Sequence, residues 1–106
     1  MRSLEFLDLS ANNFSSQIPN SIGSLQSLKE SNLSKNQFME SLPDSFMNCI
    51  NLKVFDVGHN LFTGNLPSWV FKLALESVSA SENRFNGNLD YPNTLLLAAS
   101  IKAFKS

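Results

Sequence analysis

Apolar and polar residues alternate in a segment that occurs four times, as LEFLDLSANNF, LKESNLSKNQF, LKVFDVGHNLF and LESVSASENRF from Leu4, Leu28, Leu52 and Leu75. Apolar residues take the first, fourth and sixth positions, which predicts a short strand with alternate side chains in the core. The spacing is 24 residues twice and then 23. A fixed period in the twenties predicts a solenoid whose units stack on their neighbours. We expect parallel strands near residues 6–10, 30–34 and 54–58, and a weaker one near 77–80.

Two residue types recur in register after each predicted strand. One column is phenylalanine and the other asparagine, at Phe14, Phe38, Phe62 and Phe85 and at Asn12, Asn36, Asn60 and Asn83. Because parallel strands lie ~4.8 Å apart, the rings can stack within the core. The asparagine amide both donates and accepts, so this column is interpreted as a structural ladder that bridges backbone groups of neighbouring turns.

The second half of each copy predicts short extended or 3-10 segments on the opposite side of the solenoid. Proline recurs at one position, as Pro19, Pro43 and Pro67, where its fixed φ suits an extended segment. Gly64 and Gly87 follow the phenylalanine column by two residues, where a turn can require positive φ. Ser16 and Glu40 replace that glycine in the first two copies, so those turns are expected to tolerate a strained backbone or to be distorted.

These repeats resemble the plant-specific leucine-rich-repeat family, whose consensus is L-x-x-L-x-x-L-x-L-x-x-N-x-L-x-G-x-I-P-x-x-L-G-x. The stretches SLEFLDLSANNFSSQIPNSIGSLQSL and NLFTGNLPSWVFKL are similar to ectodomains of plant receptor-like kinases and receptor-like proteins. The resemblance implies a leucine-rich-repeat solenoid of the α/β horseshoe class in its β-rich plant form, with parallel strands on the concave face and short 3-10 or extended segments on the convex face. It also implies an extracellular module that recognises peptides, steroids or partner receptors, with a membrane helix, and often a kinase domain, elsewhere in the protein.

The resemblance covers residues 1–90, which we divide into repeats at 4–27, 28–51, 52–74 and a degenerate 75–90. Residues 91–106 are interpreted as an irregular connection that leads to an absent next repeat. The sequence departs from the pattern at Ser31 and Ala80, which replace core residues, and at Asp90, which replaces the proline. Both ends of the chain stand at the same phase of the repeat and lack a polar cap, so we expect an internal fragment or a truncated product of a longer ectodomain.

Composition and charge give no indication of catalysis, of metal or cofactor binding, or of binding to nucleic acid or membrane. Eight basic and nine acidic residues give a net charge of −1 without clusters, so nucleic acid and anionic membrane are not expected partners. We expect no enzyme activity, cofactor or metal site, because His59 is the only histidine, Cys49 the only cysteine and no glycine-rich phosphate loop occurs. Cys49 occupies an apolar position, which predicts a buried thiol. No signal peptide opens the chain, and the apolar run of residues 95–101 is too short to span a bilayer, so we expect no direct membrane contact.

Residues between the predicted core positions form the candidate partner-binding surface on the concave face. They are mostly small or polar, and Phe6 is the one anchor of the type found at binding hot spots. The set comprises Phe6, Asp8, Ser10, Glu30, Asn32, Lys35, Val54, Asp56, His59, Ser77, Ser79 and Glu82. A protein or peptide ligand or a co-receptor is the expected partner, although these repeats can instead merely separate binding repeats elsewhere. Two sequons, at Asn13 and Asn32, make these asparagines candidates for N-glycosylation.

Three functions are compatible with these patterns. The first is a recognition module from the extracellular region of a plant receptor-like kinase or receptor-like protein, in cell-surface signalling. The second is part of a secreted inhibitor that resembles the polygalacturonase-inhibiting proteins. The third is a non-functional remnant of a truncated gene.

Overall fold

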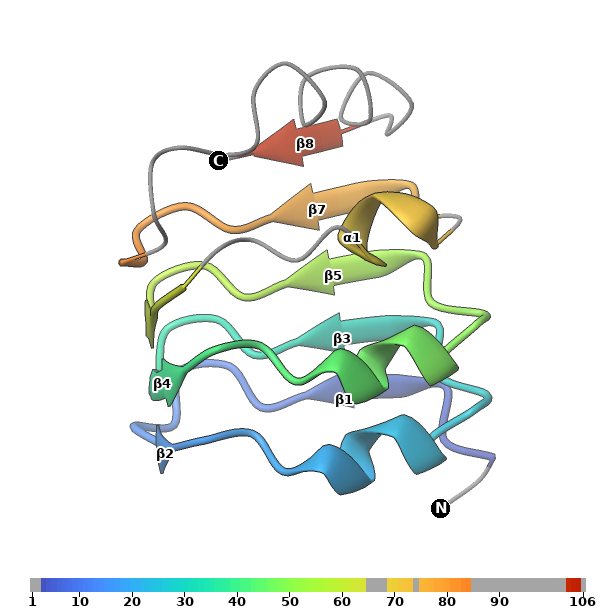
Figure 1. Ribbon diagram of the computed structural model, residues 1–106, viewed down its shortest axis with the longest axis horizontal. Coiled ribbons are helices and arrows are strands. Elements are labelled where there is room, and N and C mark those ends of the chain that lie inside the picture. Colours follow the sequence, from blue (N-terminus) through green and yellow to red (C-terminus); the bar gives the residue numbers. More distant parts are fainter. Residues whose placement is uncertain (1–2, 65–68, 74, 85–102, 106) are drawn as a thin grey trace.

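A parallel sheet of five strands stacks the repeats on one another. The computed structural model describes residues 3–64, 69–73, 75–84 and 103–105. The strands follow the order β1-β3-β5-β7-β8 and comprise β1 (Phe6–Asp8), β3 (Glu30–Asn32), β5 (Val54–Asp56), β7 (Ser77–Ser79) and β8 (Ala103–Lys105). Figure 1 shows them one above another in the same direction. The parallel strands predicted in the four sequence repeats are therefore confirmed, each as a three-residue core of its predicted range.

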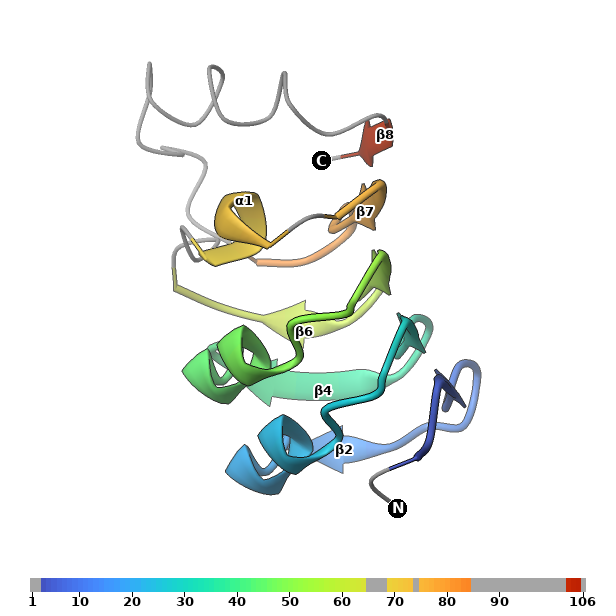
Figure 2. The same ribbon diagram turned by 90° about the vertical axis from the view of Figure 1, so that its right-hand side faces the viewer.

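The other side of the solenoid carries a second sheet and a layer of short helices. The second sheet has the order β2-β4-β6, with β2 (Ser15–Ser16), β4 (Gln37–Glu40) and β6 (Leu61–Phe62). The helices are two 3-10 turns, η1 (Asn20–Ser24) and η2 (Asp44–Asn48), and the α-helical turn α1 (Trp69–Lys72). In Figure 2 the five-stranded sheet lies at the right and the helices at the left. Pro19 and Pro43 directly precede η1 and η2 in extended conformation, with φ of −72° and −69°.

Aromatic and aliphatic side chains fill the space between the two sheets and the helices. The phenylalanine column stacks as expected, with ring centroids 6.1 Å apart for Phe14 and Phe38 and 6.2 Å apart for Phe38 and Phe62. A second cluster joins η2, β5 and α1, because Phe46 lies 5.0 Å from Phe55 and 5.6 Å from Trp69. The predictions for Phe85, Gly87, Asp90 and Pro67 concern positions outside the described residues.

Two core positions hold side chains with a hydrogen-bonding group. Ser31 is fully buried in β3, aligned with Leu7 and Phe55 in register, and its hydroxyl has no hydrogen-bond partner. Cys49 is buried as predicted, and its thiol donates to the carbonyl oxygen of Ile22 at 3.6 Å. Burial raises the pKa of the Cys49 thiol, which keeps it protonated and unreactive at neutral pH.

Strand β8 departs from the interpretation of residues 91–106 as an irregular connection at residues 103–105, the part of that range that the structure describes. Ala103–Lys105 pair in parallel with β7, and Phe104 aligns with the core residue Val78. The sequence carries a signal for this strand, since Ile101 precedes Phe104 by three residues, as Leu75 precedes Val78. The segment that leads to it is too long to fit the period, which hid this fifth strand from the repeat alignment.

A turn after the phenylalanine column requires a left-handed backbone in successive repeats. Gly64 adopts φ of 78° there, as predicted, whereas Ser16 and Glu40 both adopt φ of 67° without being glycine. A left-handed conformation costs a residue with a Cβ about 1–2 kcal/mol relative to glycine. The first two turns therefore keep the geometry of the third at the expense of local strain.

Replacing Glu40 with glycine is expected to stabilise the chain by about 0.5–1 kcal/mol, because relief of the strained φ exceeds the entropy that glycine loses on folding. The measurement is urea denaturation followed by fluorescence of Trp69, the only tryptophan. Gln37→Gly, at an exposed position of the same strand without positive φ, is the control and should destabilise the chain. Equal effects of the two substitutions would contradict the explanation.

Candidate binding face of the parallel sheet

The outward side of the five-stranded sheet, here called the sheet face, presents two rows of side chains. Strand register aligns the members of each row across the described strands, and side chains two residues apart in a strand share a face. The first row is Phe6, Glu30, Val54 and Ser77, and the second is Asp8, Asn32, Asp56 and Ser79. Between the rows, the residues Leu7, Ser31, Phe55 and Val78 turn inward. Eight of the candidate residues therefore lie together on one surface.

Phe6 is the main apolar feature of the sheet face, since 60% of its surface is exposed. Glu30 and Asp8 are also exposed, while Val54 and the remaining members of the two rows are partly buried. A protruding aromatic ring among small and polar neighbours is a typical anchor in protein interfaces. The sheet face is therefore accessible, with its apolar area concentrated at β1.

Asparagine and aspartate side chains of the second row also stabilise the turns that follow their strands. Asp8 Oδ1 accepts hydrogen bonds from the Ser10 amide at 3.0 Å and the Ser10 hydroxyl at 2.6 Å. Asn32 repeats this arrangement with Ser34, at 3.1 and 2.7 Å. Asp56 Oδ1 accepts from the Gly58 amide at 3.0 Å. This is the local side-chain-to-backbone bonding that ends strands and shapes turns, and its sequence signal is Asx followed two residues later by a small residue.

The turn at Asp8 has an electrostatic consequence. Hydrogen bonds from the Ser10 hydroxyl and then the Ser10 amide lower the pKa of the Asp8 carboxyl, because they stabilise its charged form. Asp8 therefore stays ionised through the physiological pH range. Ser10, a candidate binding residue, is engaged by this carboxylate and is less available to a partner than its position alone suggests.

Lys35, His59 and Glu82 lie beside the two rows, at the strand exits. Each is exposed and adopts a left-handed backbone, with φ of 58°, 55° and 57°. Each directly precedes a ladder asparagine, so the turn that forms the ladder also fixes the position of these three side chains. They form a polar rim of the sheet face and not a continuation of its rows.

The asparagine ladder holds these strand exits in register. Asn36 donates to the Leu9 carbonyl of the preceding repeat at 2.8 Å and to carbonyls of its own turn, at Leu33 and Ser34. Its Oδ1 accepts from the amides of Asn12 and Phe14 at 3.0 and 2.9 Å. The same bridging donation to the preceding repeat is made by Asn60 and Asn83, while Asn12 bonds within its own turn.

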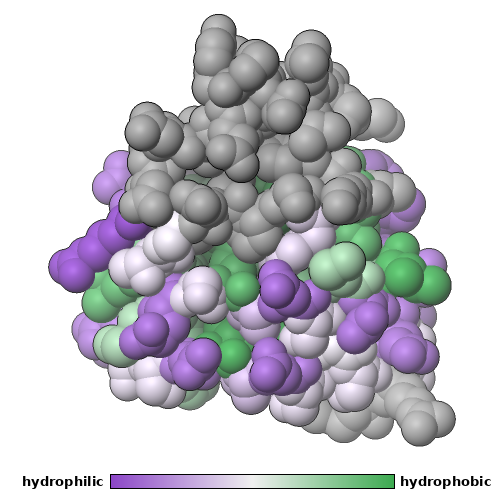
Figure 3. All heavy atoms as spheres, viewed as in Figure 1, coloured by the Kyte–Doolittle hydropathy of each residue, from purple (hydrophilic) through white to green (hydrophobic). Residues whose placement is uncertain are grey.

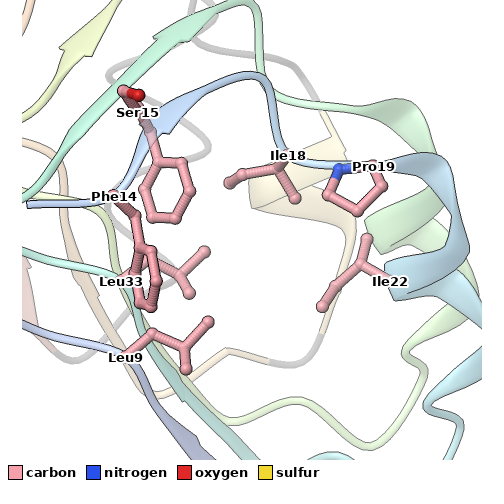
Figure 4. Close-up of a pocket in the computed structure, with 8 residues that line it drawn as sticks. Leu9, Phe14, Ser15, Ile18, Pro19, Ile22 and Leu33 are labelled. Carbon is pink, nitrogen blue, oxygen red and sulfur yellow. The ribbon is translucent and has the colours of Figure 1, made fainter. Parts of the chain in front are cut away.

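An apolar pocket of about 240 Å³ lies away from the sheet face, between the first and second repeats. Leu9, Leu33 and the ring of Phe14 line one side, and Ile18, Pro19 and Ile22 line the other (Figure 4). Ligand sites combine such apolar walls with a few polar groups that orient the ligand. Ser15 is the only polar residue in this lining, so the pocket offers little for specific orientation.

Other surfaces and chemistries are less distinctive. The face that carries the helices mixes hydrophilic and hydrophobic residues without a single dominant patch in the part that Figure 3 colours. Within the described ranges, no three metal-binding side chains gather into a group. The same ranges contain no helix with the length and apolarity needed to cross a bilayer. The sheet face therefore remains the candidate site for recognition.

The two candidate glycosylation sites differ in accessibility. Asn13 and Ser15 are exposed, whereas Asn32 is partly buried and its Oδ1 already binds the amide and hydroxyl of Ser34, the third residue of its own sequon. We expect chain secreted by plant cells to carry a glycan at Asn13 at higher occupancy than at Asn32. Glycopeptide mass spectrometry measures both occupancies, with Asn13→Gln as the control for peptide assignment. Full occupancy of Asn32 with an unmodified Asn13 would contradict the expectation.

Together, the stacked parallel strands, the second sheet and the bridging asparagines define a leucine-rich-repeat solenoid. The family model of the Leucine Rich Repeat matches residues 3–25 and 51–73. The chain carries leucine-rich repeats and resembles the ectodomains of plant leucine-rich-repeat receptor kinases. No curated protein sequence matches it.

Solved structures agree with this assignment. The ectodomain of the receptor kinase SOBIR1 from Arabidopsis thaliana is 28% identical with a TM-score of 0.80, over 95% of this chain and 55% of that one. The plant peptide hormone receptor RGFR1, in complex with RGF2, is 33% identical with a TM-score of 0.79, over 92% and 16%. The Arabidopsis receptor kinase HAESA, in complex with the peptide hormone IDA and the co-receptor SERK1, is 29% identical with a TM-score of 0.72, over 79% and 14%. The chain thus spans between about one seventh and just over half of the length of these three chains.

Proposed function

We propose that the chain is a protein- or peptide-recognition module of the extracellular, leucine-rich-repeat region of a plant receptor-like kinase or receptor-like protein, in cell-surface signalling. The observation that carries the proposal is the sheet face, where two aligned rows of exposed and partly exposed side chains begin at the exposed ring of Phe6 on the edge strand β1. Parallel strands stacked in a solenoid provide the extended surface that repeat proteins use for binding. The complexes of RGFR1 with RGF2 and of HAESA with IDA and SERK1 support protein or peptide partners.

The sheet face suits recognition better than catalysis. Its carboxylates in the second row are held by their own turns, and its side chains lie on an open sheet and not within a water-excluding pocket. Chemistry of the nucleophilic kind needs a base, a nucleophile and oxyanion donors in one place. An extended peptide or the edge of a partner receptor can instead contact several repeats at once, and we place this module on the extracellular side of the plasma membrane.

Photo-crosslinking tests this function. Benzoylphenylalanine replaces Phe6 on the sheet face or, as a matched control, Met47 on η2, where 47% of the side chain is exposed. Both proteins are incubated with secreted plant peptides and with purified receptor ectodomains. The expected result is a saturable crosslink to a defined peptide or ectodomain from position 6 only. Crosslinks only from position 47, equal yields from both positions, or none would contradict the proposal.

A further inference from the structure

The first row of the sheet face places one carboxylate between two apolar side chains. Strand register sets Phe6 and Val54 on either side of Glu30, each one strand away, so each neighbour is ~4.8 Å from Glu30 along the sheet. Phe6 and Glu30 are exposed and Val54 is partly buried. Within the described part of the chain, the Glu30 carboxylate makes no hydrogen bond or ion pair. A ligand can therefore reach the acid and both apolar neighbours together.

The charges around Glu30 favour a cationic ligand group. The second row adds the carboxylates of Asp8 and Asp56, whose Oδ1 atoms accept hydrogen bonds from the following turns. Neither row contains a basic residue in β1, β3, β5 or β7, and the register places Lys105 of β8 next to Ser79, at the opposite edge of the sheet from β1. Two lysines precede the strands, where Lys29 pairs with Glu5 at 3.2 Å and Lys53 is partly buried. Lys35 is exposed at the rim, five residues after Glu30 and outside both rows.

We propose that Phe6, Glu30 and Val54 form a subsite for an arginine side chain of a peptide or protein ligand, which rests on the recognition function proposed above. Arginine fits all three residues at once. Its planar guanidinium donates two parallel hydrogen bonds to a carboxylate and stacks on an aromatic face, here those of Glu30 and Phe6. Its aliphatic stem packs on an apolar surface such as Val54. Lysine supplies the charge without the fork or the flat face, so it binds this subsite more weakly.

Affinity selection with defined peptide pools tests the subsite. Two pools of capped heptapeptides have the same randomised flanking positions and carry either arginine or citrulline in the centre; citrulline has nearly the same shape without the charge. The full chain is immobilised, and mass spectrometry gives the ratio of retained arginine to citrulline peptides. The expected ratio is about ten, which corresponds to ~1.4 kcal/mol. Glu30→Gln should bring it to about one, and Phe6→Ala should lower it to a few-fold, since the stacking contribution of a cation on an exposed ring is ~0.5–1 kcal/mol.

Glu76→Gln is the matched control, because Glu76 is an exposed glutamate that precedes strand β7 outside both rows. This variant should keep the ratio of the unmodified chain, and the melting of every variant is followed by Trp69 fluorescence. A ratio of one with peptides still retained, or an unchanged ratio in a folded Glu30→Gln chain, overturns the subsite and leaves the recognition function standing. Retention of no peptide from either pool overturns both.

Discussion

Replacing Asn36 with alanine is expected to lower the free energy of unfolding by about 3 kcal/mol, because the change leaves several buried backbone groups without partners. The Asn36 amide is 8% exposed and serves two repeats at once. It donates to the Leu9 and Leu33 carbonyls and accepts from the Phe14 amide, at distances between 2.8 and 3.2 Å. Alanine can replace none of these bonds, and the bond to the Leu33 carbonyl is buried. Urea denaturation followed by Trp69 fluorescence measures the loss.

Asn20→Ala is the control for this prediction. Asn20 is exposed at the start of η1 and its side chain caps no helix or strand exit in the described structure. Its substitution should change the free energy of unfolding by less than about 0.5 kcal/mol, as is usual at the surface. Equal denaturation midpoints for the two variants would show that the ladder contributes little to stability.

Replacing Gly23 with alanine is expected to cost about 2 kcal/mol, because the added methyl group overpacks the contact between η1 and η2. A Cβ at Gly23 would lie 2.6 Å from the Ser45 carbonyl oxygen and 2.9 Å from the Ser45 Cβ. The carbonyl belongs to the backbone of η2 and cannot rotate away, so the two 3-10 turns must separate. Thermal melting by circular dichroism should show a lower midpoint for Gly23→Ala.

Gly58→Ala is the matched control for Gly23→Ala. The nearest atoms to a Cβ there are Asp56 Oδ1 at 3.3 Å and Ser79 Oγ at 3.4 Å, both on side chains that can adjust, with a backbone carbonyl also at 3.4 Å. Serine occupies the equivalent position in the other repeats, which shows that the turn accepts a Cβ. The cost should stay below about 1 kcal/mol, partly because alanine also restricts the unfolded chain. A loss at Gly58 as large as that at Gly23 would contradict the close-approach argument.

The strands and the core were predictable because each repeat carries the same pattern of apolar positions. Leucine at the first position and an apolar residue at the sixth recur four times, and the fourth position is apolar in every copy except at Ser31, so the other copies compensate for the departure in one. Strand β8 was missed because only one copy of its pattern is present, after a segment that breaks the period. The pairing of β2, β4 and β6 into a second sheet was also not predicted, since strands of two to four residues carry almost no periodic signal.

The sequence predicted the candidate binding residues as one set. It did not predict which of them are free on the sheet face and which are engaged in turns or lie at strand exits. Alternation along a strand identifies which side chains point outward, and it placed Phe6, Glu30 and Val54 on one face. It does not reveal that the Oδ1 atoms of Asp8 and Asn32 accept hydrogen bonds from the turns that follow them. Nor does it reveal that Lys35 lies at a strand exit with a left-handed backbone. Those facts depend on backbone conformation after the strand, where short polar side chains compete for backbone groups.

The sequence by itself determined the repeat, the direction of the strands and the residues that form the core and the ladder, because these follow from periodic hydrophobicity and from the bonding capacity of asparagine. Tertiary structure alone decided which contacts are tight and which side chains are free. The close approach of Gly23 to Ser45 and the alignment of Phe6 with Glu30 join residues about one repeat apart in the chain. Such distances depend on how adjacent repeats stack. Stacking is set by the contact between two neighbouring repeats, so the sequence of one repeat alone does not determine it.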